Sequence, residues 1–538
     1  MESIGISDSL RRRETTIPFP VEVDPSQEWD GKDGPWSTFA VRIGTPPQVA
    51  RILPGTGSNQ QMVVLPEGCM SSKDTSTCPN LRGFTFKMNE STTWENNTLY
   101  SSTSIYELGV EKRLGFEGNA IFGYDNMVLG WLGSDGPNTS NQSIAGIATK
   151  DFFLGVLGLN PRPTNFSTFN NPVPSLLQNL RDAQKIPSLS WGYTAGNQYR
   201  FNNVFGQLIL GGYDSSRFVR NNIYIPFDSQ DLVDLSVNIE RITSSDADGT
   251  RALLPSSGIS AYLDSSVSYI WLPLDACQRF EEEFGITWND SLELYLVNNT
   301  QHEKLLTRNA SIVFRIGHFS TNQTVDITFP YAAFDLTLSY PYTTNPARYF
   351  PLKRAANDSQ YTLGRVFFQE AYVIADYERK NFSVFQCNWD ASGKKDIVAI
   401  ISPQDVQLPQ DSDSSSSKLH TGALAGIAIG VVVGIIIAVY LIFRYYMKPK
   451  IIQNGISRSG PSIDSSEGDK RGEIEDLPPP TPYQMHLWAA NEDAESDVSG
   501  ASIRSENMTI ASSIVPSQRT QRTDRGSSPT RDKSNPLV

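Results

Sequence analysis

Short apolar segments separated by Gly, Asn, Asp and Pro turns fill most of this chain, from Trp36 to about Trp389. Segments such as STFAVRIG, QLILGGYD and SIVFRIG have the length and the β-branched and aromatic content of strands. Many short strands at this spacing favour a sandwich or barrel. Apolar residues at helical spacing predict short helices at Pro174–Ile186 and Leu272–Phe284. The sequence therefore predicts an all-β fold with a few short helices.

A second constraint is the uncharged apolar run from Gly422 to Phe443. About 20 such residues cross a bilayer as a helix, so we predict one transmembrane helix in contact with the lipid bilayer. Basic residues follow the run directly and place the C-terminal side in the cytoplasm: Arg444, Lys448 and Lys450. Glycines recur every four residues along the run, which is compatible with a homodimer through this helix or with an ordinary glycine-rich span.

The flanking segments are polar. We expect a flexible leader at residues 1–34, a Ser-rich stalk at 391–421 and a disordered cytoplasmic tail at 444–538. The tail contains a PxxP sequence, Pro479–Pro482, which is either a ligand for an SH3-type domain or part of a solvated linker. Residues 1–14 lack the apolar segment of a signal peptide, so we interpret the sequence as incomplete at its N-terminus.

An extracellular or lumenal location of the residues before the predicted span agrees with the many N-x-[ST] triplets found there. Each triplet alone is weak evidence, but together they predict a glycosylated surface. The predicted acceptors are Asn89, Asn96, Asn138, Asn141, Asn165, Asn289, Asn298, Asn309, Asn322, Asn357 and Asn381.

The four cysteines imply two disulfides in such a compartment. Cys69 and Cys78 enclose a short loop, and Cys277 with Cys387 is the other natural pair, although free or crossed thiols remain open. No CxxC or HExxH motif occurs, so we expect no metal and no cofactor. The formal net charge of -13 disfavours nucleic acid as a partner.

Two loops carry the most informative residues. The first lies in IGTPPQVARILPGTGSNQQMVVLP, residues 43–66, and the second in AYLDSSVSYIWLP, residues 261–273. With the segments GVLGLN, QLILGGYD, YTLGRVFF and AYVIADYERKNFSVF, they resemble the pepsin-like aspartic peptidases over roughly residues 35–390. The resemblance implies a bilobal double β-barrel, with an N-terminal lobe at residues 35–215 and a C-terminal lobe at 216–390.

In that family two aspartates, one from each lobe, share one proton and act on one water. One carboxylate takes a proton from the water while the other protonates the substrate carbonyl. The second loop matches this pattern and supplies Asp264 as the catalytic residue. In the first loop Gly55 stands where the family has Asp. The resemblance implies that Thr56, Ser58 and Ser265 support the two loops.

No Asp or Glu lies between Val41 and Leu65 to replace the missing residue. With a single acidic group, we expect peptide hydrolysis to fall by at least about 10⁴-fold. The flap of the family carries a Tyr, whereas the matching position here is Phe116, which has no hydroxyl. Arg365 replaces an acidic residue of the family, and we interpret this as a surface change.

These observations favour a membrane-anchored pepsin-like protein that is catalytically impaired and serves as a peptide-binding or surface sensor ectodomain. One alternative is an active aspartic-type endopeptidase at the cell surface or in the secretory pathway. Another is a receptor whose β domain merely resembles the family. A carboxylate from elsewhere in the chain aimed at Asp264 would overturn the view that Asp264 stands alone.

Overall fold

The computed structural model describes residues 17–405, apart from 71–74, 100–101, 167–171, 201–202, 229–232, 256–257, 321–322 and 391–393. Within this part, no helix is long and apolar enough to span a membrane. Several predictions lie outside the described residues: the transmembrane helix at 422–443, the tail at 444–538, the PxxP sequence at 479–482, the sequon at position 322, most of the stalk and the first half of the leader.

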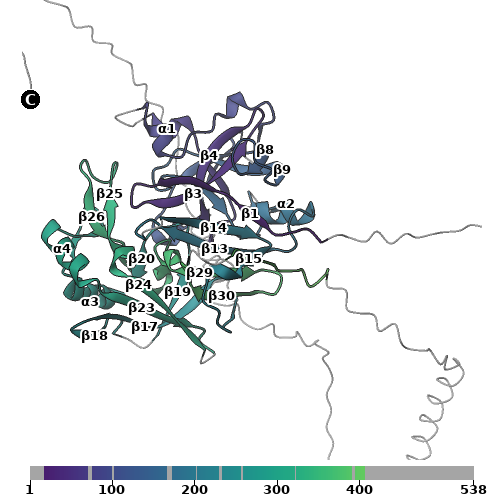
Figure 1. Cartoon of the computed structure of the whole chain (residues 1–538). Coiled ribbons are helices and arrows are strands. Elements are labelled where there is room, and N and C mark those ends of the chain that lie inside the picture. The colour runs from purple at the N-terminus through teal and green to yellow at the C-terminus, as the bar shows by residue number, and fades with distance from the viewer. Residues whose placement is uncertain are drawn as a thin grey trace, which may run out of the picture. The chain divides into compact units, whose positions relative to one another are not determined.

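The first half of the chain forms a nine-stranded sheet, drawn in purple and blue in Figure 1. Its order is β2-β3-β4-β10-β5-β9-β8-β6, with β7 also paired to β8. Its strands are β2 (Pro25–Asp30), β3 (Trp36–Ile43), β4 (Gln48–Gly55), β5 (Gln61–Val64), β6 (Glu95–Asn96), β7 (Ile105–Glu107), β8 (Asn119–Leu129), β9 (Asn138–Ile147) and β10 (Gly155–Gly158). Buried and exposed residues alternate along much of β8, as expected for a sheet with one covered face.

The second half forms an eight-stranded sheet of order β24-β23-β17-β19-β28-β20-β27, with β18 paired to β17. Its strands are β17 (Ser236–Asp246), β18 (Gly249–Ala252), β19 (Ile259–Leu263), β20 (Ile270–Leu272), β23 (Ser311–Gly317), β24 (Thr324–Pro330), β27 (Leu352–Arg354) and β28 (Thr362–Leu363). A four-stranded sheet joins it, made of β21 (Thr287–Asn289), β22 (Leu294–Leu296), β25 (Leu336–Leu338) and β26 (Ala347–Phe350).

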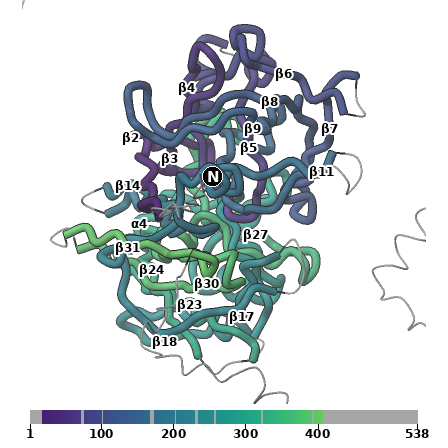
Figure 2. Tube along the Cα trace, turned by 90° about the vertical axis from the view of Figure 1, so that its right-hand side faces the viewer, coloured from purple at the N-terminus to yellow at the C-terminus, as the bar shows by residue number. Residues whose placement is uncertain are grey.

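A six-stranded sheet of order β1-β14-β13-β29-β30-β16 combines strands from both halves and lies between them in Figures 1 and 2. It contains β1 (Val21–Val23), β13 (Ser190–Asn197), β14 (Val204–Leu210), β16 (Ile225–Pro226), β29 (Ala371–Asp376) and β30 (Asn381–Gln386). The remaining pairs are β11 (Thr164–Asn165) with β12 (Pro172–Val173) and β15 (Gly212–Asp214) with β31 (Ile397–Ala399). One continuous apolar core runs through both halves.

The predicted helices are confirmed as α2 (Leu176–Asp182) and α3 (Leu274–Phe284). The Ser175 hydroxyl caps α2 by accepting from the Gln178 N–H. Two further helices, α1 (Cys78–Leu81) and α4 (Asn299–Arg308), were not predicted. Only His302 and Leu305 of α4 are buried, which explains why its apolar periodicity is weak in the sequence.

The ordered fold extends beyond both predicted limits. Strands β1 and β2 lie within the expected flexible leader, where they pair with β14 and β3. A buried ion pair fixes this segment, because Asp30 lies 2.8 Å from the guanidinium of Arg51 on β4. Residues 17–34 are therefore part of the fold, and the leader prediction is wrong for them.

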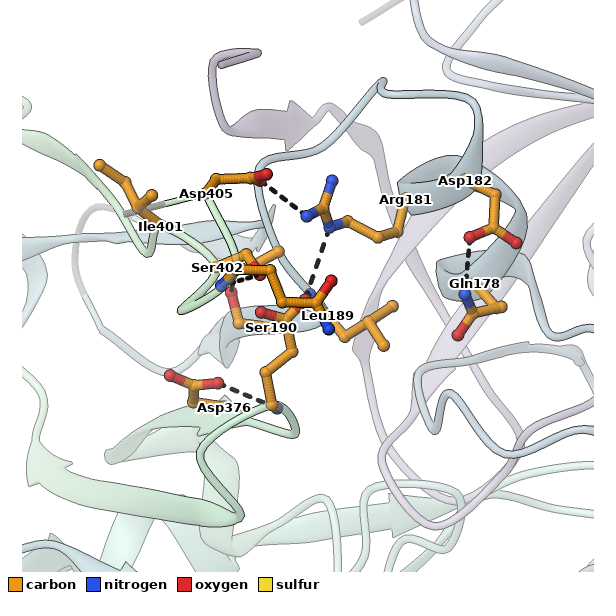
Figure 3. A network of polar contacts seen from close by, with 12 residues as sticks. Gln178, Arg181, Asp182, Leu189, Ser190, Asp376, Ile401, Ser402 and Asp405 are labelled. Carbon is orange, nitrogen blue, oxygen red and sulfur yellow. Dashed lines mark hydrogen bonds and ion pairs between the residues drawn. The ribbon is translucent and has the colours of Figure 1, made fainter. Parts of the chain in front are cut away.

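The chain also stays attached after β30. Strand β31, inside the predicted stalk, pairs antiparallel with β15. Figure 3 shows the contacts that follow it: Arg181 of α2 lies 2.7 Å from the Asp405 carboxylate, and its Nε lies 3.5 Å from Glu378. Arg379 pairs with Asp376 at 2.7 Å and donates to the Ile401 carbonyl at 2.9 Å. The segment through Asp405 is thus fastened to the first half of the molecule.

Candidate active site

Two loops meet at the centre of the described part, each at the end of a strand with the same surroundings. Strand β4 ends at Gly55 and runs parallel to β10, with Gly55 opposite Gly158. Strand β19 ends at Leu263 and runs parallel to β28, with Leu263 opposite Leu363. The apolar-Gly segments recognised in the sequence therefore lie beside the two loops, as the resemblance implied.

Reciprocal hydrogen bonds join the loops. The Thr56 N–H donates to the Ser265 hydroxyl at 3.1 Å, and the Ser265 N–H donates to the Thr56 hydroxyl at 3.0 Å. The two hydroxyls then donate across the junction, from Thr56 to the Leu263 carbonyl at 3.1 Å and from Ser265 to the Pro54 carbonyl at 2.8 Å. This cross-brace, meaning these four bonds, uses two of the three predicted supporting residues.

The third, Ser58, acts within its own loop. Its hydroxyl accepts from the Gln60 N–H at 3.1 Å, and its carbonyl accepts from the Asn160 N–H at 2.9 Å. Ser58 therefore shapes the first loop and takes no part in the cross-brace.

Gly55 leaves no open space where the family has a carboxylate. A Cβ atom built at this position would lie 2.6 Å from Val156 Cγ1, 2.7 Å from Ser266 Oγ and 3.3 Å from the Ser58 Cβ. Real Cβ atoms do not approach other atoms so closely, so an aspartate here requires Val156 and Ser266 to move. The loop has closed over the missing side chain.

Asp264 is 2% exposed and well supported. Its Oδ1 accepts hydrogen bonds from the Ser266 N–H at 2.8 Å and from the Gly57 N–H at 3.2 Å. Gly57 is required at this close approach, because a Cβ there would lie 2.6 Å from Asp264 Oδ2. The first loop thus contributes a donor to the carboxylate of the second.

A second carboxyl group faces Asp264, and it comes from a third segment. Strands β7 and β8 form a hairpin, and we call its connecting residues 108–118 the flap loop. Glu111 in this loop has a left-handed backbone, with φ 56°, and its side chain is 8% exposed. Its carboxyl lies close enough to Asp264 for each group to act on the pKa of the other. The expectation that Asp264 stands alone is therefore wrong.

The two carboxyl groups have opposite pKa shifts. Burial raises the pKa of Glu111, the negative charge of Asp264 and the hydrogen bond with it add to the rise, and Arg113 opposes it, so the pKa lies well above 4.5. Burial also acts to raise the pKa of Asp264. The hydrogen bond from Glu111, the charge of Arg113 and the bonds to Ser266 outweigh burial, so this pKa lies below 3.8. The two shifts favour the protonated form of Glu111 and the ionised form of Asp264.

Arg113 fastens the flap loop over this pair. Its guanidinium lies 3.0 Å from Glu111 Oε2 and donates to the Thr362 hydroxyl at 2.8 Å and the Ser359 carbonyl at 3.1 Å. It also lies over the ring of Tyr262, 4.6 Å from the centroid. The flap loop, from the first half of the chain, is thereby attached to β19 and β28 of the second half.

The space left beneath the flap loop is small. A cavity of about 20 Å³ is lined by residues of the two central loops, the flap loop and neighbouring segments, including Gly57, Glu111, Arg113, Tyr262 and Asp264. Such a volume holds about one water molecule. A peptide therefore enters only if the flap loop lifts and carries Glu111 away from Asp264.

Comparisons with known proteins decide the family. A family model described as eukaryotic aspartyl protease matches residues 38–387. The chain belongs to this family. The prediction of a pepsin-like aspartic peptidase family member from the sequence is thus confirmed, as is a mostly β architecture with few helices. In the pepsin-like fold, peptide segments bind in a cleft.

Relatives of this aspartyl protease family member are distant. Aspartic proteinase 3 of Saccharomyces cerevisiae is 23% identical over 385 residues, which cover 68% of this chain and 61% of that protein. Candidapepsin of Candida tropicalis is 24% identical over 271 residues, covering 50% of this chain and 60% of that protein. The chain thus spans about three fifths of the length of these relatives. An aspartic proteinase structure from Irpex lacteus aligns with a TM-score of 0.48 and 16% identity, covering 69% of this chain and 99% of that one.

Other predicted features of this aspartyl protease family member are placed by the structure. Phe116 lies in the flap loop and packs on Phe152 and Trp271, with ring centroids 5.3 and 6.5 Å apart. It lines a separate cavity of about 40 Å³ with Lys32 and Arg365 and does not reach Asp264 in the cavity under the flap loop. Burial lowers the pKa of Lys32 to about 8.

Arg365 is buried, at 3% exposure, so its interpretation as a surface change is wrong. Its guanidinium donates to the Ser268 hydroxyl at 2.9 Å and to the Ser266 carbonyl at 3.2 Å, and it stacks near Trp36. These bonds hold the back of the Asp264 loop. The family member therefore has a buried cation beneath the loop that retains its carboxylate.

The disulfide prediction is half right. Cys69 and Cys78 are bonded, but Cys277 and Cys387 are both free and buried. Cys277 on α3 faces the carbonyls of Leu272 and Lys353, whereas the Cys387 thiol lies 3.3 Å from the Thr194 hydroxyl. The two thiols lie in different packing environments and do not form a disulfide. The order of the four cysteines along the chain could not show this.

The sequon asparagines among the described residues are all exposed or partly exposed, as acceptors must be. The described residues contain no group of three or more His, Cys, Asp or Glu side chains suited to a metal ion. The prediction that neither metal nor cofactor takes part is untested by this finding.

Glu111 was not predicted, because no acid between positions 41 and 65 replaces the missing aspartate and Glu111 lies in a different segment. The signal that could have found it is an acidic residue in ELGVEKRLGFEG, the segment around the predicted flap residue Phe116. In this family the flap lies over the paired acids, so an acidic residue in the flap can reach Asp264.

Proposed function

We propose that this protein is a pepsin-like family member that binds extended peptide segments and is impaired in peptide hydrolysis. The observation that carries the proposal is the filled space at Gly55, where Val156 Cγ1 and Ser266 Oγ occupy the surroundings of the missing carboxylate. The two central loops at the base of the cleft therefore carry one carboxylate, Asp264, and no second one from the Gly55 loop. Loss of one of two cooperating acid–base groups costs at least about 10⁴-fold in rate.

Glu111 does not replace the aspartate that is missing at position 55. It belongs to the flap loop, and the cavity beneath that loop has room for about one water only. A peptide between flap and floor separates Glu111 from Asp264. The approach of Glu111 to Asp264 thus belongs to the closed, empty cleft, and we interpret it as an internal contact that a peptide displaces.

The remaining parts of the proposal follow from the sequence. The apolar run at 422–443 and the basic residues after it support a single-pass membrane protein with residues before 422 outside or in a lumen. Glycans on the exposed sequons fit that location. A sensor role, an SH3-type partner at 479–482 and a homodimer through the span remain proposals.

Cleavage of a denatured protein by the purified full-length chain, measured from pH 3 to 7, tests the impairment. We expect no pepstatin-sensitive turnover from the natural sequence. The double variant Gly55→Asp, Val156→Ala should gain activity, because the smaller side chain makes room for the new carboxylate; Val156→Ala alone is the matched control. Pepstatin-sensitive turnover by the natural protein that disappears in Asp264→Asn would reject the proposal.

One observation favours a second candidate, an active aspartic-type endopeptidase. Glu111 and Asp264 lie together beside a cavity of water size, and their pKa values are shifted in opposite directions, whereas the family's chemistry pairs one protonated with one ionised carboxyl group. Asp264 would take a proton from water while Glu111 protonates the substrate carbonyl. In this case Glu111→Gln abolishes turnover, whereas under impairment there is no turnover for it to abolish.

A further inference from the structure

Arg113 is a flap residue whose charged group lies in a complete set of contacts on the other half of the molecule. The Thr362 hydroxyl and the Ser359 carbonyl accept from its guanidinium at 2.8 and 3.1 Å, and the Tyr262 ring lies 4.6 Å beneath it. Acceptors and an aromatic face in this arrangement suit a planar cation. We call these three residues the guanidinium site.

Two residues of the guanidinium site are placed by strands outside the flap loop. Tyr262 and Thr362 lie opposite each other on the parallel strands β19 and β28. Thr362 is fully buried, and its hydroxyl also donates to the Gln360 carbonyl at 2.9 Å, which aims its oxygen lone pair at the guanidinium. The Gln360 side chain also donates to the Arg113 carbonyl at 2.8 Å, so the flap loop contacts this segment, but the pairing of β19 with β28 fixes Tyr262 and Thr362 without it.

The surrounding charge also favours a cation. Asp264 interacts electrostatically with Arg113, and Asp228 and Asp358 act on Tyr262 from neighbouring segments. When the flap loop lifts, the charge of Arg113 and the carboxyl group of Glu111 leave together. Asp264 keeps only the hydrogen bonds of its own and the first loop, and a buried carboxylate without a compensating charge is costly.

We infer that the guanidinium site binds an arginine side chain of an incoming peptide, and that Arg113 is its internal occupant in the closed molecule. This rests on the proposed function, because it concerns the peptide that the cleft accepts. A peptide whose arginine enters the guanidinium site restores the cation, the two hydrogen bonds and the ring contact that are lost when the flap loop lifts. A neutral peptide of the same shape restores only the shape.

Arginine and citrulline provide that comparison, since citrulline has nearly the same shape without the charge. Fluorescently labelled extended peptides that differ only in this residue are titrated with the purified full-length protein. Three proteins are compared with the natural sequence: Arg113→Gln, which removes the internal occupant; Thr362→Val, which removes one acceptor; and Arg220→Gln, an exposed arginine elsewhere, as the matched control.

The expected result is a preference for arginine over citrulline of about tenfold or more. Arg113→Gln should strengthen binding of the arginine peptide by several-fold, because the peptide no longer competes with Arg113. Thr362→Val should reduce the preference without changing citrulline binding, and Arg220→Gln should change neither.

Equal binding of both peptides to the natural protein and to Arg113→Gln overturns this inference while the proposed peptide binding stands. Absence of binding by either peptide to every variant overturns both, because no peptide then enters the cleft. A preference for arginine that survives in Thr362→Val at full strength and is unchanged in Arg113→Gln places the recognition elsewhere and also rejects the guanidinium site.

Discussion

The Gly55 loop and the Asp264 loop end strands with matching partners, and the cross-brace treats them almost symmetrically. They differ in what they carry: one has a buried carboxylate and the other has a glycine whose side-chain space is filled by neighbours. The braces depend on hydroxyl and peptide groups and not on the carboxylates. The central architecture of the family is therefore retained in a chain that lacks half of the catalytic pair.

The cross-brace should be the most sensitive part of this comparison. Thr56→Val removes a buried hydroxyl that accepts from the Ser265 N–H and donates to the Leu263 carbonyl. Buried groups left unpaired cost roughly 1–3 kcal/mol each, so we expect unfolding free energy to fall by about 2–4 kcal/mol. Denaturant unfolding measures it. Ser58→Ala, within one loop, is the control and should cost less; an equal loss would mean that the brace adds nothing special.

The close approach of Gly57 to Asp264 should give the next largest effect. A methyl group at Gly57 would lie 2.6 Å from Asp264 Oδ2, so Gly57→Ala must displace the carboxylate and disturb its bond with Glu111. We expect a loss of about 1–3 kcal/mol, typical of overpacking. Faster amide exchange in the flap loop should accompany it, measured by hydrogen exchange. If the flap loop exchanges as before, the first loop does not control the closed state.

The pH dependence of folding stability distinguishes the contribution of the Glu111–Asp264 pair from that of the cross-brace. The pKa of Glu111 is raised on folding, so its stabilising contribution is complete below its ordinary value of 4.5 and is lost as pH rises through the raised value. The titratable or charged groups that line the cavity with Glu111 are Tyr262 on β19, Asp264 in the loop after β19, Asp234 and Arg113. Asp264, with a lowered pKa, contributes above 3.8 and loses its contribution only as pH falls through its folded value.

Glu111→Gln keeps a neutral hydrogen-bond donor toward Asp264 at every pH. Its stability relative to the natural protein should therefore increase as pH rises above 4.5. Thermal unfolding at several pH values measures the difference. Parallel pH curves for the two proteins would show that the pKa of Glu111 is not raised on folding.

The smallest effect is expected at the other loop. Gly55→Ala places a methyl group 2.6 Å from Val156 Cγ1 and 2.7 Å from Ser266 Oγ, but these are side-chain ends that can rotate or shift. We expect a loss of about 1 kcal/mol, reduced when Val156→Ala is added. Denaturant midpoints of the single and double variants test this. Strict additivity of the two changes would show that Val156 is not the obstacle.

Local pattern predicted most of the fold, because short strands, turns and the amphipathic helices α2 and α3 leave clear periodicity. The resemblance to the family, carried by contiguous motifs, located Gly55, Asp264 and the cross-brace residues. The misses share another cause. Glu111, Arg365 and the free thiols depend on which distant segments pack together, and no spacing within the chain encodes that directly. The buried ion pair of Asp30 likewise turned a polar leader into part of the fold.

The attachment of β31 and Asp405 has a mechanical meaning. Strand β31 is held along its length by β15, and Arg181 grips the chain a few residues later. A pull directed along β31 would load the β31–β15 ladder in shear, with its hydrogen bonds loaded together and not one after another. Tension from that side would reach α2 and the first half of the molecule before it reached the loops at the centre.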